Sequence, residues 1–435
     1  MFEQTSQQLI DFIHSSPSCF HAVAQLSQQL QQAGFSPLQE SHVWALQPGH
    51  GYYTTRNGSS LIAFRIPQHW SAGYAIAAAH SDSPTFRLKE HPCLEDTHYT
   101  RFNVEKYGGG ILSTWLDRPL SVAGRIITEE NGVLVSHLVD AGRDLALIPN
   151  LAIHMNPQVN SGVPLNPQVD LLPLFGEANS SAQLMEALTA SAKVEPQQVL
   201  SADLFLYLRE SGRIWGAHRE FLSSPRLDDL QCAWSAVQGL IAADTAEVLP
   251  VCAIFDNEEV GSATKQGADS TFLQDVLDRI RENLGLTREQ QYAALASSFM
   301  VSADNGHAIH PNHPEKSDQS NFPVLNGGVV IKSSANQKYT TDAVSSGIFR
   351  YICKKANVPV QVFLNRSDMP GGSTLGNISN SHLSLNTVDI GLAQLAMHSS
   401  FETGGIKDTQ YLLTALKTFF ETAVRAEADG RYSLV

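Results

Sequence analysis

The sequence predicts an α/β protein with a mainly parallel sheet, helices on both faces and an inserted β-rich domain. From residue 226 onward, short apolar runs alternate with helical patterns, and such alternation is typical of parallel strands covered by helices on both faces. Between residues 85 and 225 the pattern changes to hairpins and to connections rich in Pro and Asn. A chain of 435 residues also exceeds what one core usually holds. We therefore expect a discontinuous domain of residues 1–84 and 226–435, interrupted by an inserted domain of residues 85–225.

The first eighty residues predict two helices, a hairpin and a buried strand. Apolar residues recur at helical spacing in segments 5–16 and 16–35. Asn57-Gly58 separates two strand-like runs and predicts the turn of a hairpin. The segment GYAIAAAH is apolar on both faces, so we expect a fully buried strand that ends on His80.

The predicted insertion consists of hairpins and one helix. Asn131-Gly132 and Ser211-Gly212 each lie between two strand-like runs, and each pair predicts a hairpin turn. The segment 177–200 is rich in Ala, Ser, Gln and Glu and predicts a helix. A domain built from hairpins has edge strands, which are natural places for two copies of a chain to pair.

Five apolar runs in the second half of the chain predict the other strands of the parallel sheet. They are VLPVCAIFD (248–256), ASSFMVSAD (296–304), GGVVIK (327–332), VPVQVFLN (358–365) and LSLNTVDI (383–390). Helical patterns lie between these runs, so each strand is expected to return to the same sheet through a helix.

Composition and charge exclude several classes of partner. The formal net charge is -14 and the pI is near 5.5, with no basic run. Nucleic acids and anionic membranes are therefore not expected as partners. The sequence also has no apolar run near the roughly 20 residues that a bilayer span needs.

Cysteine usage and the N-terminus predict a cytoplasmic protein. The N-terminus lacks a basic start followed by an apolar block, so we expect no signal peptide. The cysteines are odd in number and form no CxxC motif, which favours reduced thiols and argues against a disulfide framework or a thiolate zinc finger. They are Cys19, Cys93, Cys232, Cys252 and Cys353.

Potential metal ligands stand at the ends of several predicted strands. They are His80, then Asp256, Glu258 and Glu259, then Asp304 with His307, and finally His398, while Asp228 and Asp229 stand where a helix is expected to begin. In an open parallel sheet the carboxyl ends of the strands form the crevice where ligands bind. His, Asp and Glu without Cys suit zinc, manganese or cobalt.

Each of these features also has an ordinary structural explanation. His80 is followed by Ser-Asp-Ser-Pro, a common turn sequence, and the two adjacent Asp residues suit a helix N-terminus. His307, His310 and His313 suit a surface loop. Glu258 and Glu259 are different, because two adjacent carboxylates that end an apolar strand repel each other and need compensation. Since all these groups occur at strand ends, the sequence predicts a dinuclear metal site.

Seven motifs in order resemble the aspartyl aminopeptidases, a family of zinc exopeptidases with two cooperating metal ions. They are AAHSDSP (78–84), IPNLAIHM (148–155), SPRLDDL (224–230), FDNEEVGS (255–262), SADNGHAIHPNHPEK (302–316), IKSSANQKYTTD (331–342) and AMHSSFET (396–403). The resemblance covers nearly the whole chain and is to the bacterial branch. It implies a zinc-exopeptidase α/β domain and an inserted dimerisation domain. It also implies a homo-oligomer built from dimers, typically a tetrahedral homododecamer.

The resemblance also implies roles for individual residues. The ligands of two zinc ions would be His80, Asp228, Glu259, Asp304 and His398, with Asp228 bridging and with manganese or cobalt as possible substitutes. Asp82 would fix the tautomer of His80. Glu258 would be the general base, which takes a proton from a water held between the metals and passes it to the leaving amine.

The implied function is the removal of N-terminal residues from peptides, with a preference for Asp or Glu. Implied substrate contacts are His154, His307, Lys332 and Tyr339, together with Glu258 and Asp304. His154 is open to two roles, zinc ligand or hydrogen-bond donor, and we favour the donor because five protein ligands and a water suffice for two zinc ions. Lys332 is the expected cation for an acidic substrate side chain.

Two other functions remain open at the level of the sequence. A dinuclear-zinc deacylase or carboxypeptidase on a related fold also uses a His-x-Asp motif and a Glu-Glu pair. A non-catalytic protein that keeps the fold as an assembly scaffold is the second alternative, against which the intact Glu258-Glu259 pair argues. The physiological peptides are not indicated by the sequence.

Overall fold

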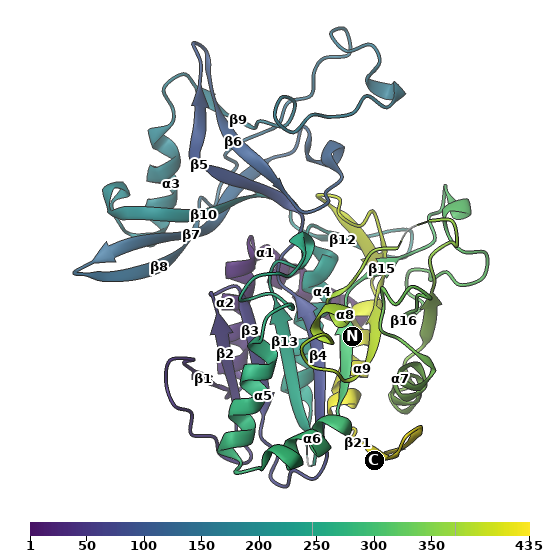
Figure 1. Cartoon of the computed structure of the whole chain (residues 1–435). Helices are drawn as coiled ribbons and strands as arrows, with labels where there is room; N and C mark the ends of the chain where they lie inside the picture. Colours follow the sequence, from purple (N-terminus) through teal and green to yellow (C-terminus); the bar gives the residue numbers. More distant parts are fainter. Residues whose placement is uncertain (246, 370) are drawn as a thin grey trace.

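Strands from both ends of the chain form one large sheet, which lies below a separate β-rich part in Figure 1. The structure is a computed structural model that describes residues 1–245, 247–369 and 371–435. In sheet order the strands are β1 (Ser36–Leu38), β2 (Gly51–Arg56), β3 (Ser60–Arg65), β13 (Leu249–Phe255), β4 (Tyr74–His80), β14 (Phe299–Ala303), β18 (Asn386–Gly391), β16 (Val329–Lys332) and β17 (Val360–Phe363). The central strands β13, β4, β14 and β18 are parallel neighbours.

Helices cover both faces of this sheet, as the sequence predicts. One face carries α1 (Phe2–His14), α2 (Cys19–Gln32), α4 (Leu227–Ala242), α7 (Ala343–Lys355) and α9 (Asp408–Phe420). The other face carries α5 (Phe272–Asn283), α6 (Arg288–Ala296) and α8 (Leu375–Ser379). The α/β fold class with helices on both faces is therefore confirmed.

The central strand β4 is buried along its whole length and ends on His80. Its alternate side chains are small, and Ala75, Ala77 and Ala79 pack in the same core as α4. The helix approaches closely because these alanines leave room for it. A second close approach occurs where α9 crosses α4, since a Cβ at Gly239 would lie 3.1 Å from Leu416 Cβ. The start of α4 is held against the end of β4 where Asp229 accepts the main-chain N–H of His80.

The β-rich part is a second sheet with its own core. In sheet order its strands are β8 (Val133–Asp140), β7 (Leu120–Glu130), β10 (Val199–Leu208), β5 (Thr85–Glu95), β6 (Tyr99–Tyr107) and β9 (Leu174–Glu177), and α3 (Ala182–Ala192) packs beside β8. Phe86, Phe102 and Leu206 are among its core residues. The predicted hairpin at Asn131-Gly132 is confirmed, because Glu130 pairs with Val133 across both turn residues. The helix predicted over 177–200 is present as the shorter α3.

The predicted hairpin at Ser211-Gly212 is wrong. Both edges of β10 are already paired, with β7 and with β5, so the following segment has no free partner there. The chain instead enters a third sheet with the order β11 (Arg213–Trp215), β12 (Phe221–Ser224), β20 (Glu402–Gly405), β19 (Ala393–Leu395) and β15 (Gly306–His307). Segment 213–224 thus pairs with strands from the C-terminal half, while the division at residues 84 and 225 stays a prediction.

Three further observations concern the described residues. The remaining sheet is the C-terminal hairpin of β21 (Val424–Ala428) and β22 (Arg431–Leu434). The five cysteines are all free thiols. Within the described ranges, the helices include none with the length and apolar character needed to cross a bilayer.

Candidate metal centre

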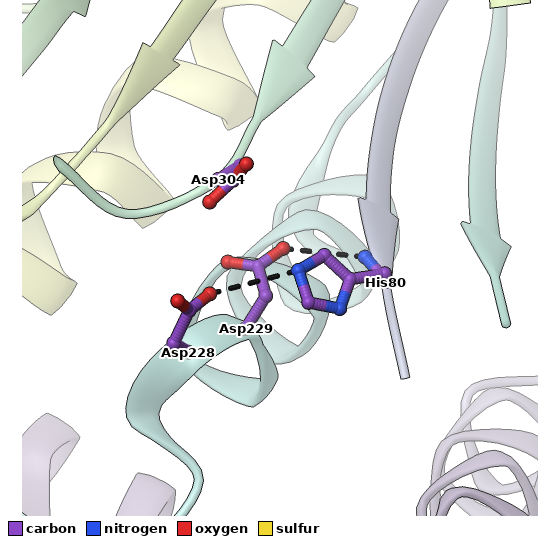
Figure 2. A group of neighbouring side chains, drawn as sticks. All are labelled: His80, Asp228, Asp229 and Asp304. Carbon is purple, nitrogen blue, oxygen red and sulfur yellow. Dashed lines mark hydrogen bonds and ion pairs between the residues drawn. The ribbon is translucent and has the colours of Figure 1, made fainter. Parts of the chain in front are cut away.

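Three overlapping clusters of His, Asp and Glu side chains form at the carboxyl ends of β4, β13 and β14. In each cluster, one ligand atom from every residue lies within 4.8 Å of the others. The clusters are His80, Asp228, Asp229 and Asp304; His80, Glu258 and Glu259; and Asp228, Glu259 and His398. Figure 2 shows the first of these, with the carboxylates of Asp228 and Asp229 turned toward His80. All five predicted zinc ligands lie in these clusters, and so does Glu258.

His80 presents one ring nitrogen to the clusters because the other is fixed by a hydrogen bond. Its Nδ1 lies 3.1 Å from the main-chain oxygen of Asp82, which only accepts, so Nδ1 carries the proton. The carboxylate of Asp82 lies 3.3 Å from the same nitrogen. Nε2 is left with its lone pair, 3.6 Å from Asp228 Oδ1. An imidazole held in this way is suited to ligate a metal through Nε2.

The carboxylate of Asp82 also fixes the segment that carries the two Glu residues. It accepts the main-chain N–H groups of Glu258 and Glu259, both at 3.2 Å. Tyr107 of the β-rich part donates its hydroxyl to the same carboxylate at 2.7 Å. The Glu pair lies in the 3-10 turn η4 (Glu258–Val260), directly after β13. Asp82 therefore joins the ends of two neighbouring strands.

Asp228 lies between two imidazoles. Its carboxylate oxygens are 3.6 Å from His80 Nε2 and 3.4 Å from His398 Nε2. Burial opposes ionisation of Asp228, but the two neighbouring imidazoles, His398 ahead of His80, outweigh it and lower the pKa of this carboxyl. Asp229 follows in the first turn of α4 and accepts the main-chain N–H of His80 at 3.2 Å.

His398 is also fixed in one tautomer, by the β-rich part. Its Nδ1–H donates to Gly109 O at 3.0 Å, and its Nε2 lies 3.4 Å from Glu259 Oε1. The carboxylate of Glu402 accepts the main-chain N–H of His398 at 2.7 Å and that of Asp228 at 3.0 Å. Glu402 is 2% exposed. One buried carboxylate thus joins the backbones of two residues that come from distant parts of the chain.

The electrostatics of the clusters suit a divalent cation. Among the described residues, Asp228 Oδ1, Asp229 Oδ1 and Glu259 Oε1 are buried without a hydrogen-bond partner. Burial, followed by the nearby acids, raises the pKa of Glu258 to about 7 and that of Glu259 well above its ordinary value. Buried carboxylates with unused lone pairs are costly unless a cation compensates them. The N and O donor set, without thiolates, fits zinc.

The predicted substrate residues divide into two groups. Lys332 is buried at the end of β16, where Nζ donates to Asp304 O at 2.7 Å and lies 5.2 Å from the ring centre of Tyr339. The ring of His307 packs edge-on against Phe363 beside them. These residues lie on the Asp304 side of the clusters. His154 is exposed in the connection between β8 and β9 and belongs to none of the clusters.

Sequence reasoning missed three contacts that hold this site together. Asp229 is a candidate ligand in the sequence, but its contact with the main chain of His80 depends on how α4 begins. Tyr107 and Glu402 were not singled out. Each acts through a partner more than twenty residues away, and a single sequence has no local signal for such contacts.

Comparison with protein families and curated proteins gives one consistent result. Residues 12–420 match the family described as "Aminopeptidase I zinc metalloprotease (M18)". The chain is 45% identical over 424 residues to a probable M18 family aminopeptidase 2 of Clostridium novyi, covering 95% of this chain and 98% of that protein. It is 40% identical over 431 residues to the protein of the same description in Ectopseudomonas mendocina, covering 97% and 99%.

Solved structures agree with this match. The chain resembles a structure of the Ape4 and Nbr1 complex with a TM-score of 0.92 and 37% identity, over 97% of this chain and 86% of that chain. It resembles the mApe1 dodecamer of S. cerevisiae with a TM-score of 0.84 and 29% identity, over 96% and 97%. Both similarities extend over the large sheet and the β-rich part.

Proposed function

Because the chain belongs to the M18 family of zinc metalloproteases and is therefore a zinc-dependent aminopeptidase, we propose that it removes Asp and Glu residues from the N-termini of peptides. The observation that carries the proposal is the set of His, Asp and Glu clusters at the strand ends. Asp228 lies between His80 and His398 and would be the ligand that the two ions share. The proposed ligands of two zinc ions are His80, Asp228, Glu259, Asp304 and His398.

In this proposal the protein supplies the proton transfers. Bound zinc polarises the scissile carbonyl and lowers the pKa of the attacking water. Glu258 accepts the proton of that water and delivers it to the amine that leaves. Asp82 supports this role, because it holds the main-chain N–H of Glu258 and thereby the position of the base. His307 and Tyr339 contact the substrate on the Asp304 side.

The acidic preference rests on Lys332. The net charge of -14 repels acidic substrates at long range, so an Asp or Glu side chain needs a local cation. Lys332 has three N–H donors, and the nearest protein acceptors are Asp304 O at 2.7 Å and Asn305 O at 3.4 Å. Among the described residues no acceptor at hydrogen-bond distance takes the third donor, although the Asp304 carboxylate lies 3.7 Å away, and we propose that a substrate carboxylate accepts it.

The proposal extends to the assembly and the compartment. A similar chain forms the mApe1 dodecamer of S. cerevisiae, and we infer a tetrahedral dodecamer built from dimers for this chain. The five free thiols favour the reducing cytoplasm. The acidic charge argues against nucleic acids and anionic membranes as partners.

The two adjacent Glu residues allow a direct test of the mechanism. Glu258→Gln removes the proton acceptor and keeps the volume, so we expect full metal content with a loss of kcat on the order of 10² to 10⁴. Glu259→Gln weakens a ligand and should lower the zinc content. Metal analysis and hydrolysis of an aspartyl chromogenic substrate measure both effects.

Equal metal content and equal activity in both variants would contradict the assigned roles. A parallel assay with the N-acetylated substrate separates the remaining alternatives. An aminopeptidase needs the free α-amine, whereas a deacylase would release acetate from the blocked substrate and a carboxypeptidase would cleave only a blocked peptide that has a free C-terminal carboxylate. A metal-loaded wild-type protein that is inactive on both substrates would indicate a scaffold.

A further inference from the structure

A cavity of about 600 Å³ lies between the large sheet and the β-rich part. Asp82 and Asp228 form part of its wall, so it borders the metal centre. His307, Lys332 and Tyr339 are not among the described residues that line it. The cavity is therefore separate from the region that the proposed function assigns to the substrate. Its volume lies in the range of small-molecule sites, roughly 300 to 1,000 Å³.

One cation on this wall lacks a counter-ion. Arg226 is mostly buried, and among the described residues its guanidinium has one protein acceptor, Ile13 O at 3.0 Å. The Nε–H group is buried without any partner, and the described residues place no carboxylate at ion-pair distance from this side chain. An arginine side chain is charged at neutral pH. A buried charge without a partner is costly.

Most other buried charges of the wall have protein partners, while Asp228 belongs to the metal centre, where a bound cation would compensate it. Asp203 lies between Arg87 and Arg125, at 2.7 and 2.9 Å. Asp82 and Glu402 each accept two main-chain N–H groups. Asp256 accepts the N–H of Asn257 at 2.7 Å. The exposed lining residues Glu105, Lys106 and Lys265 face water. Among the described cations of the buried wall, Arg226 is therefore the one without an ion pair.

The rest of the wall suits the apolar body of a ligand. Phe20 at the start of α2 and Phe205 of β10 face the cavity from the two parts of the chain, with their ring centres 6.4 Å apart. The N-terminus of α2 also lies on the wall and adds a positive dipole end. We propose that the cavity binds a small organic carboxylate, whose charged end pairs with Arg226 and whose apolar body lies against Phe20 and Phe205.

Calorimetric titration of the zinc-loaded protein tests this proposal with two matched probes. Phenylacetate carries the charge and the apolar body, whereas phenylacetamide has the same shape without the charge. A hydroxamate inhibitor is kept at saturation, so that neither probe binds at the zinc ions. We expect saturable binding of phenylacetate and at least about tenfold weaker binding of phenylacetamide, because hydrogen bonds to a charged group contribute roughly 1.5–3 kcal/mol.

Three variants locate the binding. Arg226→Gln should weaken phenylacetate binding at least about tenfold, while Lys265→Gln, which removes an exposed lining cation, should leave it unchanged. Phe205→Trp fills the cavity without touching a charge and should also weaken binding, which keeps the test valid if Arg226→Gln does not fold. The proposal is wrong if phenylacetate does not bind saturably or if the amide binds equally well. Undiminished binding in Phe205→Trp would also overturn it.

Discussion

At the scale of the residue, single buried carboxylates hold the metal centre together. Asp82 contacts the imidazole of His80 and the main chain of both Glu residues, and it receives the hydroxyl of Tyr107. Glu402 receives the main-chain N–H groups of Asp228 and His398. Neither residue belongs to the three clusters, yet both determine where cluster residues lie.

Replacing Glu402 by Gln should lower the zinc content. The side-chain amide has one oxygen where the carboxylate has two, and its NH₂ group would face a main-chain N–H. Asp228 or His398 then loses its support. Loss of such supports around metal ligands typically costs 10- to 100-fold in metal affinity. A zinc titration that follows the thermal unfolding temperature measures this effect independently of activity.

The variant Glu421→Gln is a suitable control, because Glu421 pairs with Lys417 on the surface of α9. Its zinc affinity should equal that of the wild type. Unchanged zinc affinity in Glu402→Gln would show that the two ligand segments keep their positions without this carboxylate.

Lys332→Ala should lower kcat/KM much more for aspartyl than for alanyl substrates. The reason is that one N–H of the buried ammonium remains for a substrate carboxylate, while the others are near Asp304 O and Asn305 O. Kinetics with both chromogenic substrates measure the difference. Lys338→Ala is the matched control, since Lys338 is an exposed lysine in the following loop.

Equal losses on both substrates would point to another role for Lys332. Its ammonium lies 3.7 Å from the carboxylate of Asp304, so its removal would then act by releasing a proposed metal ligand. A parallel fall in zinc content identifies that case.

At the scale of the element, the end of β18 positions Asp304. Gly391 has no side chain, and a Cβ there would lie 2.7 Å from Asp304 C and 2.9 Å from Asn305 Cα. Gly391→Ala should therefore displace Asp304, and a misplacement of about 1 Å commonly costs on the order of 10² in rate. Kinetics and zinc content measure the result.

A glycine elsewhere provides the comparison. Gly347 is exposed in α7, and nothing lies within 4 Å of a Cβ built there. Gly347→Ala should keep full activity and raise the free energy of unfolding by about 0.5–1 kcal/mol, as chemical denaturation would show. Full activity in Gly391→Ala would mean that β18 shifts without moving the ligand.

Much of the element order could be predicted, because the signals are local. Asn57-Gly58 and Asn131-Gly132 form the turns expected from their sequence, and the apolar run before His80 forms the buried strand. The hairpin predicted at Ser211-Gly212 is wrong because a turn sequence does not indicate which sheet edges are free to pair. The third sheet joins strands from residues 213–224 and 306–405, and such long-range pairing leaves no periodic pattern in either segment.

The site was predictable for a related reason. Parallel strands end at the same edge of a sheet, so ligands that follow β4, β13 and β14 meet without any knowledge of long-range contacts. The contacts of Tyr107 and Gly109 depend on how the β-rich part is seated, and that of Glu402 depends on how the third sheet lies against the start of α4. No sequence spacing encodes that arrangement.

At the scale of the whole molecule, His154 should serve the metal centre of a neighbouring subunit. It is exposed in the connection between β8 and β9, which extends outward from the β-rich part in Figure 1. Leu151, Ile153 and Met155 beside it are also exposed, at 52, 49 and 72%, as expected for a segment that meets another copy. A His there is suited to donate a hydrogen bond to the oxyanion of the transition state.

Mixing two inactive variants tests this arrangement. His154→Ala and Glu258→Gln subunits are refolded together and assayed on an aspartyl substrate. If His154 acts across the interface, each mixed dimer regains one complete site, and random pairing gives about a quarter of wild-type activity. A mixture that stays inactive would place His154 in the site of its own chain.

The hydrogen bond from His398 Nδ1 to Gly109 O limits which parts of the gene can be exchanged by recombination. The β-rich part supplies the acceptor that fixes this imidazole, and Tyr107 supplies a donor to Asp82. A recombined gene that replaced residues 85–208 by a short linker would still encode every strand-end acid. It would encode neither contact, so the insertion cannot be shuffled as an independent module without rebuilding the site beneath it.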